Sequence, residues 1–374
     1  MSKWRKILLA SAALALMGSS ALISSSARAD ILLGVAGPMS GEDSGFGEQY
    51  RHGAEMAVAD LNAKGGLLGQ KLVIMLGDDG CTPKQAVAVA NMMAAKHVSA
   101  VIGHFCSSAS IAASGVYAEN DIPQISPGST SPALTERGLS NVFRVCGRDD
   151  AQAAVMARYI RDHANLRGRA IAVVSDKTPF GRSITDLFIK SLRGMGTPEA
   201  LFQTITAGEK DFSPLIDSLK ASKAELLFFG GYPADAAQLT RQLKEKGLTI
   251  PMLAGDSLAT TDFWTQAGEA GNGTLFTFNP DPRQLPSNSA LVQRFRDSGF
   301  EPEFYTLYSY AAVQAWAQAV TKAGSTSPAE VEKMLKTNSF PTVLGPLAFD
   351  VKGDATGSGY VVYMWKNGKF SYAD

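Results

Sequence analysis

Two successive runs of alternating strand and helix patterns constrain the fold of this chain more than any other feature. The first run extends from Ile31 to Gly147, and the second from Asp150 to Phe278. In both runs, short apolar segments alternate with stretches of helical length and periodicity. Such alternation is typical of parallel sheets built from right-handed crossovers. We therefore predict an α/β chain with two doubly wound parallel-sheet lobes.

The expected elements follow from apolar segments and capping residues. We expect strands at residues 31–36, 72–76, 100–103, 123–126, 141–145, 170–175, 226–229, 250–253 and 274–278. We expect helices at residues 46–64, 108–120, 150–164, 180–194 and 234–246. A further helix is expected after Thr82, which stands at the N-cap position, with Pro83 at the first position and Gln85 three residues on.

The C-terminal third has too few strand patterns to form a third sheet. Residues 289–298, 304–324 and 327–337 indicate helices, the last with a capping box between Ser327 and Glu330. Residues 347–350 and 360–365 are expected to form a final antiparallel pair. These segments should complete the two earlier lobes, so the chain crosses between the lobes several times.

The first 29 residues predict a cleaved secretory signal peptide. Basic residues at positions 3, 5 and 6 precede the apolar stretch 7–17, which is too short to span a bilayer. Ala27-Arg28-Ala29 then forms a cleavage signal before Asp30. A membrane anchor is the alternative interpretation. A lipid anchor is not expected, because no cysteine follows the apolar stretch to carry a lipid. We expect a secreted, periplasmic protein that starts at Asp30.

The mature chain of 345 residues is mildly acidic and long enough for two domains. It has 31 basic and 35 acidic residues, a net charge of −4, and no basic stripe that would bind nucleic acid. Its four histidines lie singly and no His/Cys spacing suits zinc, so we expect no metal and no cofactor.

An oxidising compartment permits one disulfide among the three cysteines. Cys81 and Cys106 each follow a predicted strand, which can place them side by side at one sheet edge. A bridge between them would close a loop of about 26 residues, worth about 3–4 kcal/mol. Cys146 lies in an apolar segment, where a buried free thiol is the simplest expectation.

Two sheet edges carry the candidate binding residues, because ligands of open α/β sheets bind beyond the carboxyl ends of the strands. In the first run, hydroxylic residues follow two strands, namely Ser107-Ser108 and Gly128-Ser129-Thr130-Ser131. Hydroxyls and amides at a helix start favour an anion such as a carboxylate, although each segment could be an ordinary cap or turn. In the second run, Tyr232 and Asp256 follow two strands and suit a cation. Together the two edges suit a zwitterion.

An enzymatic function has little support. Gly255-Asp256-Ser257-Leu258 spells an esterase signature, but the last histidine, His163, precedes that serine and so cannot be its usual partner. No G-x-S-x-G elbow, P-loop or dinucleotide fingerprint is present. We predict a binding protein and not an enzyme.

Several strings resemble the bacterial periplasmic leucine/isoleucine/valine-binding proteins over essentially the whole mature chain. They are AVADLNAKGG (57–66), PKQAVAVA (83–90), VIGHFCSS (101–108), TAGEKDFS (206–213) and Gly345-Pro346-Leu347. The resemblance implies the type I periplasmic binding fold, with three crossover segments and a ligand cleft between the lobes. It implies an N-terminal lobe of residues 30–148 plus 280–354 and a C-terminal lobe of 149–279 plus 355–374. It also supports the Cys81–Cys106 disulfide.

The resemblance assigns roles by matching position. Ser107 and Thr130 would hold the ligand carboxylate, Gly128 would offer its carbonyl to the ammonium group, and Asp256 stands where the family has a glutamate that pairs with that ammonium. Tyr232 matches a tyrosine of the same site. The remaining pocket positions are Phe46, Phe105, Cys106, Phe180 and Tyr305. The alternative for the aromatic residues at 46, 105 and 305 is plain core packing.

Departures from the family pattern bear on specificity. Phe46 and Phe180 replace tyrosines, Asp256 is one methylene shorter than glutamate, and Phe105 replaces a leucine and should narrow the pocket. We expect small amino acids such as alanine, valine, threonine or proline, or an ω-amino acid such as GABA, to bind better than leucine. The partners implied are an amino acid and inner-membrane ABC permease subunits, with the binding protein a monomer. A sensor role, or an amide, urea or aromatic acid as ligand, are the rival functions.

Overall fold

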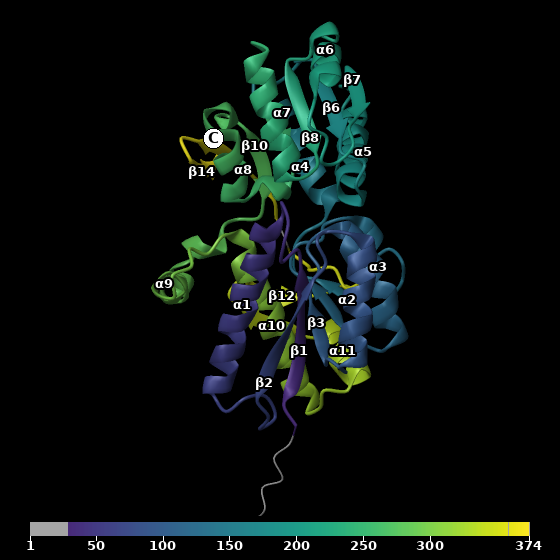
Figure 1. Cartoon of the computed structure of the whole chain (residues 1–374), viewed down its shortest axis with the longest axis vertical. Helices are drawn as coiled ribbons and strands as arrows, with labels where there is room; N and C mark the ends of the chain where they lie inside the picture. The colour runs from purple at the N-terminus through teal and green to yellow at the C-terminus, as the bar shows by residue number, and fades with distance from the viewer. Residues whose placement is uncertain (1–28, 358, 374) are drawn as a thin grey trace, which may run out of the picture.

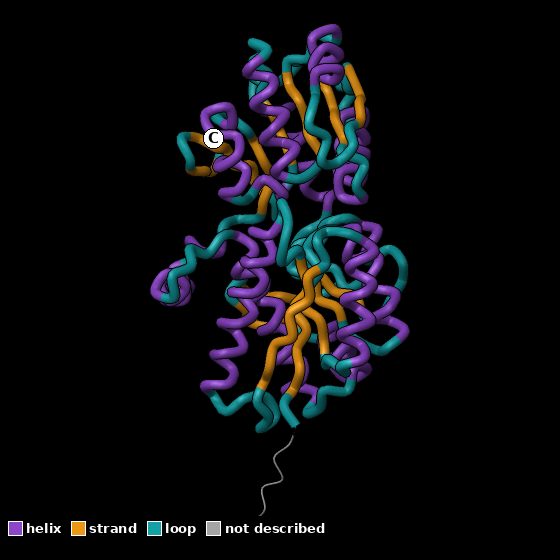
Figure 2. The backbone as a smooth tube through the Cα atoms, viewed as in Figure 1, coloured by secondary structure: helices purple, strands orange, loops and turns teal. Residues whose placement is uncertain are grey.

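The computed structural model describes residues 29–357 and 359–373, and the predicted signal peptide lies outside these residues except for Ala29. The described chain forms two α/β lobes stacked along the long axis of the molecule (Figure 1). Strands run through the middle of each lobe and helices lie on both sides of them (Figure 2). The prediction of two α/β lobes is confirmed.

The first lobe is built on a five-stranded parallel sheet of order β2-β1-β3-β4-β5. Its strands are β1 (Ile31–Gly37), β2 (Leu72–Asp78), β3 (Ala100–Ile102), β4 (Gln124–Ser126) and β5 (Val142–Arg144). Its helices are α1 (Ser44–Ala63), α2 (Pro83–Ala95), α3 (Ser107–Glu119), α10 (Phe304–Ala323) and α11 (Pro328–Thr337). Helix α1 packs along α10, and α2 packs along α3. The central strands are therefore buried on both faces, which explains their continuous apolar sequence.

The second lobe is built on a seven-stranded sheet of order β14-β13-β10-β9-β8-β6-β7. Its strands are β6 (Ile171–Ser175), β7 (Leu201–Thr204), β8 (Leu226–Gly230), β9 (Met252–Ala254), β10 (Leu275–Phe278), β13 (Val361–Lys366) and β14 (Lys369–Tyr372). Its helices are α4 (Asp149–Asp162), α5 (Pro179–Gly194), α6 (Ser213–Ala221), α7 (Pro233–Glu245) and α8 (Thr261–Ala267). Strands β6 to β10 pair in parallel, whereas β13 and β14 add an antiparallel edge.

The remaining elements are a helix, a hairpin and short 3-10 helices in the connections between the elements named above. They are α9 (Ser289–Asp297), the hairpin β11 (Ser339–Thr342) with β12 (Gly345–Ala348), and short 3-10 helices η1 (Pro132–Leu134), η2 (Asp256–Leu258), η3 (Gly268–Gly271), η4 (Pro282–Gln284) and η5 (Pro286–Asn288). None of the helices among the described residues is long and apolar enough to cross a membrane.

Two sequence predictions about local structure are wrong. Residues 347–350 and 360–365 do not pair with each other: β12 pairs with β11, and β13 pairs with β10 and β14. The turn at Val343 and Leu344 places β11 next to β12. Pairing these two strands closes a shorter loop than pairing β12 with residues 360–365 would. The Ser327 side chain makes no capping hydrogen bond, although α11 begins at Pro328. The capping box occurs instead at Glu303 and Thr306, at the start of α10.

Other boundaries agree with the sequence within a few residues, whereas β7, β11, β14, α6 and α8 were not predicted. Thr82 caps α2 as predicted, since its hydroxyl accepts a hydrogen bond from the Gln85 amide at 3.3 Å. Strand β7 escaped prediction because it is a four-residue edge strand with no buried residue, so its sequence lacks the apolar run of a central strand.

Three segments carry the chain between the two sheets. Residues 145–148 join β5 to α4, residues 279–281 join β10 to η4, and the third crossover leads from Asp354, which bridges to Arg144, to β13. Several side chains connect the lobes directly, among them Lys210 Nζ and Glu42 Oε1 at 3.2 Å. The two lobes are thus in contact in this structure, which we call the closed arrangement. The residue boundaries assigned to each lobe stay a prediction.

Candidate functional site

One wall of the candidate site is the carboxyl edge of the first sheet. Strand β3 ends at Ile102, and Ser107 opens helix α3 a few residues later; strand β4 ends at Ser126, and its loop carries Thr130. Both Ser107 and Thr130 are almost fully buried and line a cavity between the lobes. The unpaired amides of the first helical turn and these hydroxyls form a set of donors suited to a carboxylate.

A buried arginine fixes the loop that carries Thr130. The Arg144 guanidinium donates to the carbonyls of Ser129 and Ser131 at 2.8 and 2.9 Å, on either side of Thr130. Its charge is balanced by Asp354, whose carboxylate lies 2.5 Å from Arg144 Nε. Sequence reasoning missed this arginine, because nothing in its local pattern indicates a contact with a residue 210 positions away.

The glycine at position 128 is required by close packing. A Cβ atom at Gly128 would lie 2.6 Å from the Tyr50 hydroxyl and 2.9 Å from the Phe105 ring. No side chain fits in that space, so the backbone of Gly128 itself faces the cavity. The family resemblance assigns its carbonyl to the ammonium group of the ligand, and this role stays a prediction.

The opposite wall comes from the carboxyl edge of the second sheet. Tyr232 follows β8 at the start of α7, Phe180 lies in the first turn of α5, and Asp256 follows β9 at the start of η2. All three line the same cavity as Ser107 and Thr130. Ser257 also lines it, and its hydroxyl donates to the Gly231 carbonyl at 2.7 Å. That serine was predicted to have no catalytic partner.

The carboxylate of Asp256 is the charged group of this cavity wall. It is 3% exposed, and it accepts hydrogen bonds from the Tyr305 hydroxyl at 2.6 Å and from the Gln152 side-chain amide at 3.0 Å. Tyr305 belongs to the first lobe and Asp256 to the second, so this bond joins the lobes. Burial raises the pKa of Asp256 to about 7, against the lowering effect of the Tyr305 hydrogen bond.

Replacing Asp256 by asparagine should stabilise the ligand-free protein more at pH 8 than at pH 5. In the unfolded chain the carboxyl ionises near 3.8, whereas in the folded protein its pKa is about 7. The folded state therefore holds the extra proton between these values, and the stability contributed by this group falls as the pH rises through that window. The difference in the free energy of unfolding between variant and wild type should grow by about 2–3 kcal/mol from pH 5 to pH 8. Urea unfolding at both pH values measures it, and an equal difference at both would contradict the raised pKa.

Gln152 positions Asp256 and was not anticipated from the sequence. Its side chain accepts from the Asp256 amide at 3.1 Å and from the Thr277 hydroxyl at 2.8 Å, and it donates to Asp149 at 2.8 Å. All of these groups are buried. Gln152 lies on α4, far from β9 in sequence, so only the tertiary structure brings it to the site.

Four aromatic side chains enclose the cavity: Phe105 and Tyr305 from the first lobe, and Phe180 and Tyr232 from the second. Phe105 meets Tyr305 edge to face at a centroid distance of 5.2 Å, and Phe180 lies 5.4 Å from Tyr232. Phe46 does not line the cavity. It stacks behind Phe105 with ring centroids 3.8 Å apart, so it supports the wall instead of forming it.

The disulfide between Cys81 and Cys106 is confirmed, with the two Cα atoms 5.3 Å apart. Cys106 does not line the cavity, contrary to the position expected for its backbone, but it immediately precedes Ser107. The bridge thus ties the start of α3 to the loop after β2. Cys146 is a buried free thiol as expected, and burial raises its pKa.

The cavity is small in the closed arrangement. It has about 10 Å³ of free space, roughly the room that one water molecule needs. Eight of the ten predicted binding residues line it, all except Phe46 and Cys106. A space of this size is too small for an amino acid while the lobes are in this arrangement.

Comparison with known proteins identifies the family. The sequence profile of the family described as "Periplasmic binding protein" matches residues 30–369. The chain belongs to this family. Within it, the chain is of the Leu/Ile/Val-binding type: it is 48% identical to the Leu/Ile/Val-binding protein homolog 1 of Brucella melitensis, over 93% of this chain and 94% of that protein.

Further relatives agree with this assignment. The binding protein is 46% identical to an amino acid binding protein of Pseudomonas aeruginosa, over 98% of both chains. Its fold matches the leucine binding protein LivK of Thermotoga maritima with a TM-score of 0.85, at 27% identity and covering 92% of this chain and 98% of that one. The family consists of binding proteins, which confirms that the chain is not an enzyme.

Proposed function

We propose that this binding protein captures a free amino acid in the periplasm and delivers it to the permease of an ABC importer. The observation that carries the proposal is the two-sided cavity, with Ser107 and Thr130 on one lobe and the buried Asp256 on the other. Donors for a carboxylate and a partner for an ammonium group therefore face each other. The relatives at 48% and 46% identity, a Leu/Ile/Val-binding protein homolog and an amino acid binding protein, support the same ligand class.

The order of steps in the binding cycle follows from the placement of the carboxylate-binding groups on the first lobe and of Asp256 on the second. The ligand carboxylate docks first on the amides and hydroxyls of Ser107 and Thr130, since these lie on one rigid lobe. The second lobe then closes and brings Asp256 and Tyr232 against the ammonium group, in a hinge motion about the three crossovers. Closure excludes water, which strengthens the charge-assisted hydrogen bonds. The closed form is what the permease recognises in this proposal.

The aromatic walls favour small aliphatic amino acids or GABA over leucine. Phe105 cannot retreat, because Phe46 is stacked directly behind it. Tyr305 is held at both ends, its hydroxyl by Asp256 at 2.6 Å and its backbone amide by the Gln49 side chain at 3.0 Å. A larger ligand side chain would have to displace these packed rings, and overpacking of this kind costs about 1–3 kcal/mol.

Calorimetry with the mature chain, stripped of bound ligand by unfolding and refolding, tests both parts of the proposal. We expect alanine, valine, threonine, proline or GABA to bind at least about tenfold more tightly than leucine. Leucine as the tightest ligand would refute the size preference, and no binding by any amino acid would refute the function. Loss of amino acid uptake on deletion of the gene distinguishes transport from a sensor role.

Replacing Phe105 by leucine should shift the preference towards larger ligands. The smaller side chain opens the wall beside Tyr305, so the affinity for leucine should rise by about tenfold while that for alanine changes little. Phe188→Leu is a matched control, because Phe188 is fully buried in the second lobe and stacks on Phe228, away from the cavity. The same shift in that control would show that the walls do not set the preference.

A further inference from the structure

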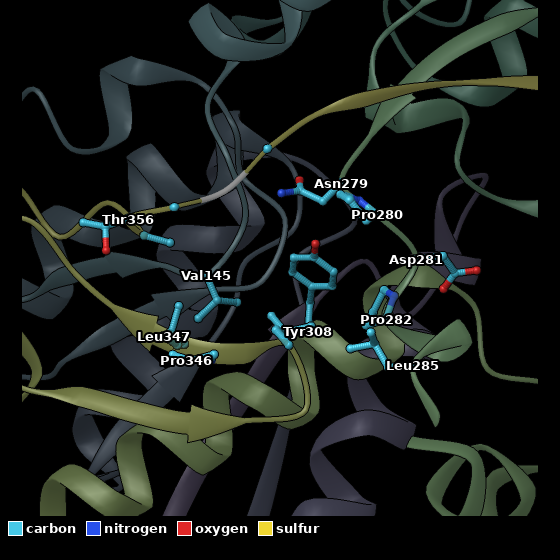
Figure 3. Close-up of a pocket in the computed structure, with 14 residues that line it drawn as sticks. Val145, Asn279, Pro280, Asp281, Pro282, Leu285, Tyr308, Pro346, Leu347 and Thr356 are labelled. Atoms are coloured by element: carbon cyan, nitrogen blue, oxygen red, sulfur yellow. The ribbon is translucent and has the colours of Figure 1, made fainter. Parts of the chain in front are cut away.

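A second cavity lies where the chain crosses between the lobes (Figure 3). It has about 380 Å³ of free space, far more than the amino-acid cavity. All three crossovers contribute to its walls, through Val145, through Asn279 to Asp281, and through Ala355 and Thr356. The first lobe supplies Tyr308 and the turn of the β11–β12 hairpin. We call this cavity the hinge pocket.

The wall of the hinge pocket combines apolar residues with three neutral polar side chains, Asn279, Tyr308 and Thr356, of which Thr356 donates to the Ala348 carbonyl at 3.3 Å. Neither the Asn279 carboxamide nor the Tyr308 hydroxyl makes a hydrogen bond to another described residue, and both side chains are at least nine-tenths buried. Figure 3 shows the two side chains near each other in the pocket. Burial raises the pKa of Tyr308, so its phenol stays neutral. Neither polar head is among the buried atoms without a partner, so both remain accessible from the pocket and can hydrogen-bond to a ligand there.

The pocket offers no free charge among the described residues. Asp281 is the one ionisable acid of its wall, and Arg283 neutralises it with bonds of 2.8 and 2.7 Å to the two carboxylate oxygens. The apolar part of the wall comes from prolines and aliphatic residues, such as Pro282, Leu285 and Leu347. This lining excludes an ionic ligand and fits a neutral one with an apolar body.

We propose that the hinge pocket binds a small neutral molecule with an apolar ring or branched body and one hydrogen-bonding head, and that its occupancy favours the closed lobes. The head engages Asn279 and Tyr308, and the apolar body packs on the prolines and the hairpin. Because three crossovers form the walls, opening of the lobes changes the shape of the pocket. A ligand that fits the closed shape therefore binds that state better and shifts the equilibrium towards it.

Coupling to the amino-acid cavity follows from this geometry. The lobes are held together here by Tyr305 with Asp256 at 2.6 Å and by the Thr261 amide with Glu303 at 3.0 Å. Stabilising the closed arrangement at the hinge makes amino-acid binding tighter, and by linkage the amino acid tightens binding in the hinge pocket by the same factor. This part rests on the proposed function, whereas binding in the hinge pocket does not.

Benzamide, which has an apolar ring and an amide head, is the probe. Ligand-observed NMR with the mature chain should show binding with a dissociation constant of about 1 mM, as expected of a fragment with few atoms.

Leu344→Trp, at a half-buried pocket position on the hairpin turn, should abolish binding, and Tyr308→Phe should weaken it severalfold. Val351→Trp is the matched control, since Val351 is 89% exposed and outside the pocket, and should bind as the wild type does. Absence of binding, or equal binding by Leu344→Trp, would overturn the proposal.

Titration of valine with and without saturating benzamide tests the coupling. We expect the affinity for valine to rise by about fivefold in the wild type and to stay unchanged in Leu344→Trp. An unchanged affinity in both proteins would refute the coupling, and competition between the two ligands would place benzamide in the amino-acid cavity and refute the hinge pocket. The protein could also bind benzamide, lose that binding in Leu344→Trp, and yet bind no amino acid. That result would uphold the hinge pocket and refute only the proposed function.

Discussion

Replacing Asp256 by alanine should weaken amino-acid binding by about 3–5 kcal/mol, or roughly two to four orders of magnitude. The carboxylate is 3% exposed, so an ammonium group beside it has no access to water once the lobes close. Without the carboxylate, that charge is buried with only neutral oxygens around it. The loss should appear in the dissociation rate more than in the association rate, since the contact forms after docking on the first lobe.

Calorimetry on three variants separates this role from a general loss of structure. Asp256→Asn keeps the shape of the side chain and an acceptor for the Tyr305 hydroxyl, and should lose nearly as much affinity as Asp256→Ala. Asp235→Asn is the matched control, because Asp235 is a buried acid of the same lobe that accepts from the Gly208 amide at 3.0 Å and lies outside the cavity. Unchanged affinity in Asp256→Ala would remove Asp256 from the site.

Removing the disulfide by replacing both Cys81 and Cys106 with serine should destabilise the protein by about 3–4 kcal/mol. The two cysteines are 25 positions apart, and the bridge restricts the unfolded chain over the loop between them. The bridge also fixes the start of α3, because Cys106 precedes Ser107. Amino-acid affinity should therefore fall as well, by a smaller amount.

Urea unfolding under oxidising conditions measures this effect. Cys146→Ala is the control, since Cys146 is a buried free thiol and its replacement leaves the bridge intact. A reducing agent should bring the wild type to the stability of the double variant and leave the double variant unchanged. If wild type and double variant unfold at the same urea concentration, the bridge does not stabilise the first lobe.

The sequence predicted most of the residues that line the cavity between the lobes, because the ends of strands can be recognised in it. Ser107, Thr130, Tyr232 and Asp256 each follow an apolar strand pattern, and parallel strands bring their carboxyl ends to one edge. The family resemblance added Phe105, Phe180 and Tyr305, all of which line the cavity. The same resemblance placed Phe46 in the wall of the cavity, whereas in the structure its ring lies behind Phe105. This difference depends on the packing of α1 against the loop after β3, which the sequence does not indicate.

The residues that the sequence did not indicate are those that act through others. Gln152 orients Asp256 from α4, and Arg144 holds the Thr130 loop from the end of β5. Each makes contacts across more than ten positions, and neither lies in a local pattern that differs from an ordinary helix or strand residue. The bond between Tyr305 and Asp256 likewise exists only when the lobes meet.

The α/β class, the two-lobe organisation and the residues at the strand ends can be predicted from the sequence, because alternating periodicity and capping chemistry are local properties. Four features became visible only in the tertiary structure. They are the antiparallel edge of the second sheet, the hydrogen-bond partners of Asp256, the short distance between the aromatic side chains around the cavity, and the hinge pocket. These features depend on contacts between segments that are far apart in the chain, and such contacts arise from how the lobes and crossovers pack together.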